Sequence, residues 1–166
     1  MKRRWLCLFV ENDIGVLARI SGLFSGKSYN LDSLTVGTTE DATVSRMTIS
    51  LTSDDKIFEQ IKKQLNRCVE VIKVVDYTDI PIHIKEILFI RVNDCSEKDK
   101  KELFRMAKIF SVSVIDYDFS SVLLECTQTD NRNNALINLL QKMFLNRLEI
   151  VRGGSVAVEA IGISEK

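Results

Sequence analysis

The chain has 166 residues, and its 23 Lys and Arg residues are balanced by 23 Asp and Glu residues. A formal charge of zero argues against a nucleic-acid or anionic-membrane partner, because both need concentrated positive charge. This length allows one domain or two small ones, whose cores need neither a disulfide nor a structural metal. The four cysteines form no CxxC pair, and we see no secretory signal and no apolar run of about 20 residues. We therefore expect a cytoplasmic chain without a membrane span.

The first half of the chain predicts the order strand, helix, strand, strand, helix, strand. The four strands are expected over residues 5–10, 31–38, 44–52 and 69–76. The first helix carries apolar residues at the spacing of one buried face, namely Val16, Leu17, Ile20, Leu23 and Phe24. Ser53 or Asp54 can cap the second helix. This order is the split βαβ, or ferredoxin-like, arrangement. Its helices cover one face of the sheet, and an open second face invites a partner, often a second copy.

Residues 78–83 are expected to form a linker, because Pro81 cannot donate to a sheet ladder. His83 is the single histidine, and we interpret it as a solvated linker residue, because no His or Cys cluster accompanies it to bind a metal. The element order then repeats, with a helix capped by Ser96, another opening at Asp130, and a final stretch, 148–161, that forms one broken strand or two short ones. The predicted fold is α+β with two ferredoxin-like βαββαβ units, residues 1–77 and 84–166.

The turn before the first helix is the candidate binding site. The first N–H groups of a helix have no intrahelical partner and carry partial positive charge, so they can receive a small carboxylate. Gly15 allows a ligand to approach the backbone, and Asn12 offers both a donor and an acceptor. The ordinary alternative, which spacing alone favours, is a strand-to-helix turn in which Asp13 is only the helix cap.

No catalytic constellation is apparent, since the sequence has neither a Gly-rich phosphate loop nor a His paired with a nucleophile motif. Arg152-Gly153-Gly154 is interpreted as a tight turn beside a strand end, with an anion cradle as the alternative. Residues 131–134 are interpreted as a solvated helix start. These patterns favour a binding or regulatory module over a small enzyme on a ferredoxin-like fold.

Four segments resemble one known family: residues 8–17 (LFVENDIGVL), 20–24 (ISGLF), 29–34 (YNLDSL) and 45–49 (SRMTI). They are similar to the regulatory, or small, subunit of acetolactate synthase (acetohydroxyacid synthase). The N-terminal unit resembles an ACT domain, a ferredoxin-like amino-acid sensor. The second half resembles the family's C-terminal domain more weakly, through Glu86 and the Arg152-x-Gly154 region.

The resemblance implies a chain with no active site of its own. Such a subunit binds the catalytic large subunit, which condenses pyruvate with pyruvate or 2-oxobutyrate using thiamine diphosphate, Mg2+ and FAD, cofactors that belong to that partner. It raises the partner's activity and confers feedback inhibition by valine in branched-chain amino acid biosynthesis. It also forms a homodimer through the ACT domain.

The resemblance further implies an effector site shared between two chains. One chain contributes Asn12, Gly15, Val16 and Leu17, and the other contributes Asn30 and Leu31. Valine's isopropyl group needs a small apolar pocket, for which Val16, Leu17 and Leu31 are suited. One residue departs from the family pattern, because Ser28 stands where the family usually has Gly. The alternative is therefore a subunit that activates its partner but has lost or changed effector specificity.

Overall fold

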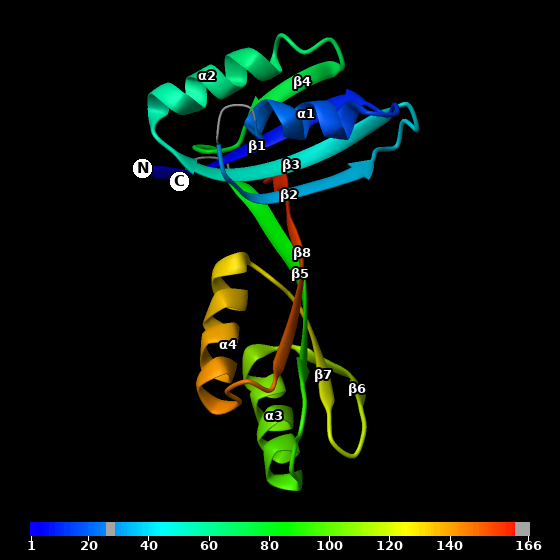
Figure 1. Cartoon of the computed structure of the whole chain (residues 1–166), viewed down its shortest axis with the longest axis vertical. Helices are drawn as coiled ribbons and strands as arrows, with labels where there is room; N and C mark the ends of the chain where they lie inside the picture. Colours follow the sequence, from blue (N-terminus) through cyan, green and yellow to red (C-terminus); the bar gives the residue numbers. More distant parts are fainter. Residues whose placement is uncertain (26–28, 162–166) are drawn as a thin grey trace. The chain divides into compact units, whose positions relative to one another are not determined.

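The computed structural model describes residues 1–25 and 29–161; Gly26, Lys27, Ser28 and residues 162–166 lie outside the described part. The first half contains β1 Lys2–Glu11, α1 Val16–Ser25, β2 Leu31–Thr38, β3 Val44–Ser53, α2 Asp55–Leu65 and β4 Val71–Asp76. The second half contains β5 Ile82–Val92, α3 Glu97–Phe110, β6 Ser113–Tyr117, β7 Val122–Gln128, α4 Asp130–Met143 and β8 Leu148–Glu159. The predicted βαββαβ order is confirmed in both halves (Figure 1).

The first sheet has the strand order β2-β3-β1-β4, and α1 and α2 cover one of its faces (Figure 1). The strands are antiparallel, and Leu6 of β1 is paired with Ile49 of β3. Alternate residues of these strands enter the core under the helices, including Leu6, Leu8, Met47 and Ile49. Each fully buried Leu or Ile stabilises the fold by about 1.5–3 kcal/mol, so this face fixes the register of the sheet.

The other face of the first sheet differs from the prediction. It was expected to be open, but residues of the chain's own C-terminal segment contact it. Thr35 Oγ1 donates a hydrogen bond to the Ser155 carbonyl at 3.1 Å, and Arg46 Nη2 donates to the Ala157 carbonyl at 2.8 Å. The prediction of an uncovered face is therefore wrong at these positions, where β8 covers the sheet.

Two compact units make up the chain: residues 1–83 together with those from Ser155 onward, and residues 84–154. The predicted domain ranges, 1–77 and 84–166 with a linker at 78–83, remain a prediction. The compact units differ from these ranges at the end of the chain, because the residues from Ser155 onward belong to the first unit. β8 runs through the change of unit as one strand, so the expected break at Gly153 and Gly154 is absent. The interpretation of Arg152-Gly153-Gly154 as a tight turn is wrong, because all three residues lie within that strand.

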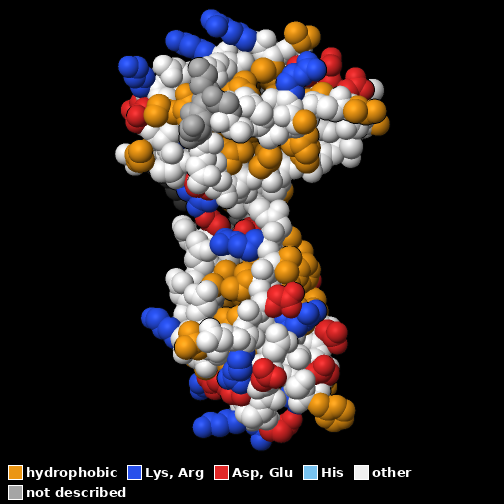
Figure 2. All heavy atoms as spheres, viewed as in Figure 1, with side chains coloured by type: hydrophobic (Ala, Val, Ile, Leu, Met, Phe, Trp, Pro, Cys, Tyr) orange, Lys and Arg blue, Asp and Glu red, His pale blue; other side chains and the backbone are white. Residues whose placement is uncertain are grey.

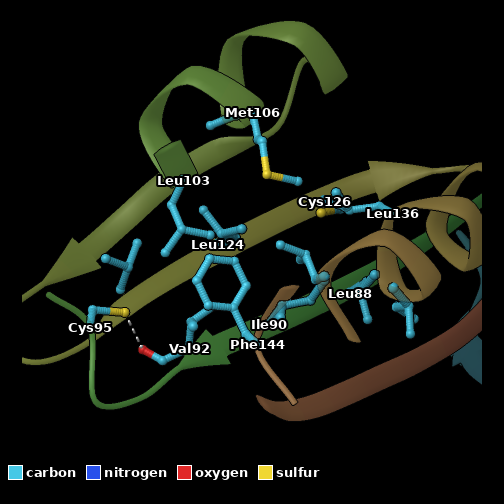
Figure 3. Close-up of a cluster of buried hydrophobic side chains, with 14 residues drawn as sticks. Leu88, Ile90, Val92, Cys95, Leu103, Met106, Leu124, Cys126, Leu136 and Phe144 are labelled. Atoms are coloured by element: carbon cyan, nitrogen blue, oxygen red, sulfur yellow. Dashed lines mark hydrogen bonds between the residues drawn. The ribbon is translucent and has the colours of Figure 1, made fainter. Parts of the chain in front are cut away.

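The second sheet has the order β6-β7-β5-β8, and its core lies between the strands and helices α3 and α4 (Figure 3). Cys95 and Cys126 are buried there, and the Cys95 thiol donates to the Val92 carbonyl at 3.3 Å. Burial raises the pKa of Cys126 to about 11, with a smaller contribution from Glu125. The neutral thiol is therefore favoured, and Cys126 is a small buried residue of this core.

Helix starts follow the predicted capping signals. Asp54 accepts a hydrogen bond from the Ile57 N–H, which selects Asp54 over Ser53 as the cap of α2. Ser96 forms a capping box with Asp99 at the start of α3. Helix α4 begins at Asp130, as expected, and Thr129 caps it. Such side-chain oxygens satisfy N–H groups that the helix itself leaves unpaired, and each is worth about 1 kcal/mol.

Candidate functional site

The turn before α1 depends on Gly15. Its carbonyl accepts a hydrogen bond from the Arg19 N–H at 2.9 Å, which places Gly15 at the N-cap position. The φ of Gly15 is +88°, a conformation that side-chain-bearing residues rarely adopt, although no atom lies within 4 Å of an added Cβ. Glycine is thus required here by the backbone and not by crowding.

The side chain of Asp13 does not cap α1, which was the alternative role for this residue. Its carbonyl accepts from the Val16 N–H at 3.4 Å, and its carboxylate has no hydrogen-bond partner among residues 1–25 and 29–161. The first-turn N–H groups of α1 consequently have no acidic side chain of the helix over them. The partial positive charge of the helix start faces an exposed turn, which suits a carboxylate ligand.

Asn12 holds this turn to the loop between β2 and β3. Its Nδ2 donates to the Ala42 carbonyl at 2.9 Å, and its Oδ1 accepts from the Ser45 hydroxyl at 2.9 Å. Its backbone N–H donates to the Thr43 carbonyl at 2.8 Å. One amide hydrogen and one lone pair of the Asn12 side chain are left for a ligand, so Asn12 has a structural role beside any binding role.

The loop that receives Asn12 is itself held by Asp41. The Thr43 hydroxyl donates to Asp41 Oδ1 at 2.6 Å, and the Thr43 N–H donates to the same oxygen at 2.9 Å. These two hydrogen bonds, that of the hydroxyl first, lower the pKa of Asp41. An ionised Asp41 therefore fixes the loop that carries the Ala42 acceptor.

Helix α1 buries a narrower face than the apolar spacing predicts. Val16, Ile20 and Phe24 are at most 5% exposed, but Leu17 is 44% exposed. The prediction that Leu17 shares the buried face is wrong, because Leu17 lies one residue, about 100° around the helix, from Val16. An exposed Leu17 beside the turn leaves apolar surface where a ligand or a second chain can contact it.

The remaining two predicted site residues lie beyond the other end of α1. Asn30 is exposed, and Leu31 is partly buried against the core of the same unit. Ten helical residues span about 15 Å. Figure 1 shows α1 running from the end of β1 toward the start of β2, so one chain does not bring Asn12 and Asn30 together. Ser28, the residue that departs from the family pattern, lies outside the described residues.

Sequence reasoning missed a polar cluster in the second unit. Glu86 is 4% exposed and accepts hydrogen bonds from Arg152, while Asn133 Nδ2 donates to Glu86 Oε2 at 3.0 Å. The predicted solvated start for residues 131–134 is wrong at Asn133, which is 1% exposed. A signal was present, because Asn133 precedes Leu136 and Leu140 by three and seven residues, on the buried stripe. Arg152 is bound to Glu86, and this contact is evidence against the anion cradle.

Two further features are absent from the part of the chain that the structure describes. No group of three or more His, Cys, Asp or Glu residues is arranged to hold a metal ion there. No described helix is long and apolar enough to cross a membrane. Figure 2 shows basic, acidic and apolar side chains interspersed on the face in view.

Comparison with known proteins identifies the class first. Residues 6–73 match the model of the AHAS small subunit-like ACT domain, so the first unit is an ACT domain. Residues 85–161 match the model described as the small subunit of acetolactate synthase.

Whole-chain relatives agree with both models. The acetolactate synthase small subunit of Aquifex aeolicus is 37% identical, covering 95% of this chain and 81% of its own. The probable small subunit of Archaeoglobus fulgidus is 39% identical over 92% of this chain and 94% of its own. The crystal structure of the Thermotoga maritima small subunit superposes with a TM-score of 0.87 at 32% identity, covering 98% of this chain and all of that one. The chain belongs to the family of acetolactate synthase small subunits.

Proposed function

We propose that this chain is the regulatory subunit that binds the catalytic large subunit of acetolactate synthase, raises its activity and confers feedback inhibition by valine. The chain would act in the cytoplasm, in branched-chain amino acid biosynthesis. The chemistry belongs to the partner, which would hold thiamine diphosphate, Mg2+ and FAD. Membership of the small-subunit family supports the assignment to this partner.

The observation that carries the sensor role is the start of α1, where the N-cap residue is Gly15 and no described side chain caps the helix. A valine carboxylate at this position would accept hydrogen bonds from the first-turn N–H groups, beside Gly15. The ammonium group needs acceptors, which backbone carbonyls and the Asn30 side chain can supply. The isopropyl group would pack on Leu17, whose exposed surface is available at this end of the helix.

The separation of the two halves supports a site formed by two chains. Within one chain the turn at Asn12 and the start of β2 lie at opposite ends of α1, about 15 Å apart. In the sheet formed by the described residues β2 is an edge strand, so one side of it can pair with another chain. Val36 on β2 is 47% exposed and Leu17 is 44% exposed, which gives such a homodimer apolar surface to bury.

The test is a thermal-shift titration of the full chain with valine, leucine, isoleucine and an unrelated amino acid. A ligand at a hundred times its dissociation constant stabilises the folded state by about 2.7 kcal/mol. For a chain of this size, that is a rise of about 5–11 °C in melting temperature. Asn30→Ala is the clean variant, because Asn30 is exposed and its truncation should change stability by less than about 0.5 kcal/mol. We expect it to abolish the valine shift.

Asn12→Ala needs a matched control, because Asn12 also holds the loop of residues 39–43. Ser45→Ala removes the hydroxyl that donates to Asn12 Oδ1 and leaves the ligand-facing atoms unchanged. A ligand role for Asn12 predicts that Asn12→Ala loses valine binding while Ser45→Ala keeps it. If the reconstituted enzyme were activated by the chain but insensitive to all three branched-chain amino acids, the subunit would activate without sensing. No activation of any catalytic subunit would refute the proposal itself.

A further inference from the structure

The distal half of β8, residues 155–159, lies on the helix-free face of the first sheet and belongs to the same compact unit. Ser155 and Ala157 are 1% and 6% exposed, whereas Val156 and Val158 are 56% and 50% exposed. This alternation is typical of a strand with one covered face. Because the covered positions carry small side chains, the backbone of β8 comes close enough to the sheet for direct hydrogen bonds.

Side chains of the sheet hold this segment by its backbone. The Ser155 N–H donates to Ser33 Oγ at 3.0 Å, and its carbonyl accepts from Thr35 Oγ1 at 3.1 Å. Arg46 Nη2 donates to the Ala157 carbonyl at 2.8 Å. The guanidinium of Arg46 is itself fixed, since it lies 5.5 Å from the ring centroid of Phe9. We call these three hydrogen bonds the β8 clasp.

The clasp shares a strand with the candidate effector site. Leu31 is the first residue of β2, immediately after Asn30, and Ser33 and Thr35 lie two and four residues further along the same strand. Among the described strands, β2 pairs with β3 alone, and its register shifts between Leu31 and Ser33. An edge strand with an irregularity at this point has fewer backbone bonds that resist a shift than a central strand has. Ordering Asn30 and Leu31 around a ligand would therefore change the position of Ser33 and Thr35.

The other end of the clasp is continuous with the second unit. β8 is a single strand from Leu148 to Glu159, and only Gly153 and Gly154 separate Arg152 from Ser155. Arg152 binds the buried Glu86 of β5. Two covalently linked residues therefore join Ser155 to a residue that is fixed within the second unit.

We propose that the β8 clasp relays the state of the effector site to the C-terminal unit. This inference rests on the proposed function, since it concerns how valine binding at Asn30 and Leu31 becomes inhibition of the catalytic partner. Coupling of this kind requires contacts that differ between the two states. Under this proposal the hydrogen bonds of Ser33 and Thr35 to Ser155 of β8 are the contacts that change, and neither residue is among the predicted effector residues.

The experiment compares binding with inhibition in one double variant, Ser33→Ala with Thr35→Val. Valine binding to the full chain is measured by calorimetry, and inhibition is measured on the enzyme reconstituted with its catalytic subunit. We expect the dissociation constant for valine to stay within about twofold of that of the native chain. The concentration for half-maximal inhibition should rise about fivefold or more, within the usual range of coupling factors. Activation without valine is measured alongside.

Thr52→Val is the matched control. It removes a hydroxyl of β3 that donates a hydrogen bond to Asp32 of β2 at 3.0 Å, and it leaves the three hydrogen bonds to β8 unchanged. It should leave both binding and inhibition unchanged. Arg46→Met is a second variant in case the double variant folds poorly, because it keeps an unbranched side chain and removes the guanidinium that donates to Ala157 and to Tyr77 and lies over Phe9. It should weaken inhibition in the same direction.

Two outcomes would overturn the clasp as a relay. Unchanged inhibition in both clasp variants would show that the signal takes another route. A parallel loss of binding and inhibition would show that Ser33 and Thr35 shape the pocket instead of relaying its state. A native chain that neither binds valine nor confers inhibition would refute the proposed function, and the relay with it. The measurements on the native chain therefore distinguish a failure of the proposed function from a failure of the relay alone.

Discussion

Arg152 binds Glu86 through two hydrogen bonds, from Nε to Oε1 at 2.9 Å and from Nη2 to Oε2 at 2.7 Å. A buried carboxylate is thereby compensated by a guanidinium that comes from another strand, a geometry that is strong and directional. Burial by itself acts to raise the pKa of Glu86, but the hydrogen bonds from Arg152 and Asn133 outweigh it. The pKa of Glu86 consequently lies below its usual value.

Glu86→Gln should lower the free energy of unfolding by about 1.5–3 kcal/mol at pH 7, because hydrogen bonds to a charged group are lost. The pKa of Glu86 is lowered in the folded state, so its stabilisation is fully present above the unfolded pKa of about 4.3. It is lost as the pH falls through the folded value. The difference in the free energy of unfolding between the native protein and Glu86→Gln should therefore become smaller below about pH 4. Urea unfolding at several pH values measures this difference.

Glu149→Gln is the control for this change. Arg91 and Glu149 form an ion pair in the same sheet, but their side chains are 50% and 54% exposed. Exposed pairs contribute about 0–1 kcal/mol, and solvent screens them. If Glu149→Gln cost as much as Glu86→Gln, burial of the carboxylate would not be the reason for the stability of the Glu86 pair.

Two glycines at α1, Gly15 and Gly22, give a second prediction, in which the two substitutions have effects of opposite sign. Gly15→Ala should destabilise the fold by about 1 kcal/mol or more, because its φ of +88° is strained for alanine even though space is available. Gly22→Ala, inside α1, meets no atom within 4 Å and should stabilise by about 0.5–1 kcal/mol. Chemical denaturation of both variants measures the difference. Equal effects would argue against backbone strain at Gly15.

The local parts of the fold could be predicted from sequence because they depend on neighbouring residues. Apolar residues at period 2 and period 3.6 predicted the strands and helices. Ser96 indicated the start of α3, because its capping hydrogen bonds involve residues close in sequence. The exposure of Leu17 could not be predicted in this way, since it depends on how α1 is rotated over the sheet. Apolar spacing gives the width of a face only roughly.

The long-range contacts had no local signal. Ser33 and Ser155 are separated by 122 positions, and neither stands out in its own segment. The same holds for Asn12, whose type suggested a ligand group but whose side chain also bonds Ala42 and Ser45. The predicted effector residues stay a prediction, because their role depends on a ligand and a second chain.

Gly153 gives a third prediction, in which the cost of a substitution comes from steric crowding and not from backbone conformation. A Cβ on Gly153 would lie 2.5 Å from Ile87 Cγ2 and 3.4 Å from the Ile87 carbonyl oxygen. Gly153→Ala should therefore destabilise the fold by about 1–3 kcal/mol, the usual cost of overpacking. Ile87 is 42% exposed, so Ile87→Ala alone should cost less than the 2–5 kcal/mol typical of a buried Ile.

The pair can be tested as a double-mutant cycle, because Ile87→Ala removes the methyl group that Gly153→Ala would strike. The double variant should be more stable than the sum of the two single changes predicts, by about 0.5–3 kcal/mol. Denaturant unfolding of the four proteins gives this coupling energy. Val151→Ala, in the same strand with a side chain 53% exposed, provides a control partner that should show additive behaviour with Gly153→Ala. Additivity of Gly153→Ala with Ile87→Ala as well would mean that β8 moves away from β5 to accept the new methyl, and that glycine is not needed for their close approach.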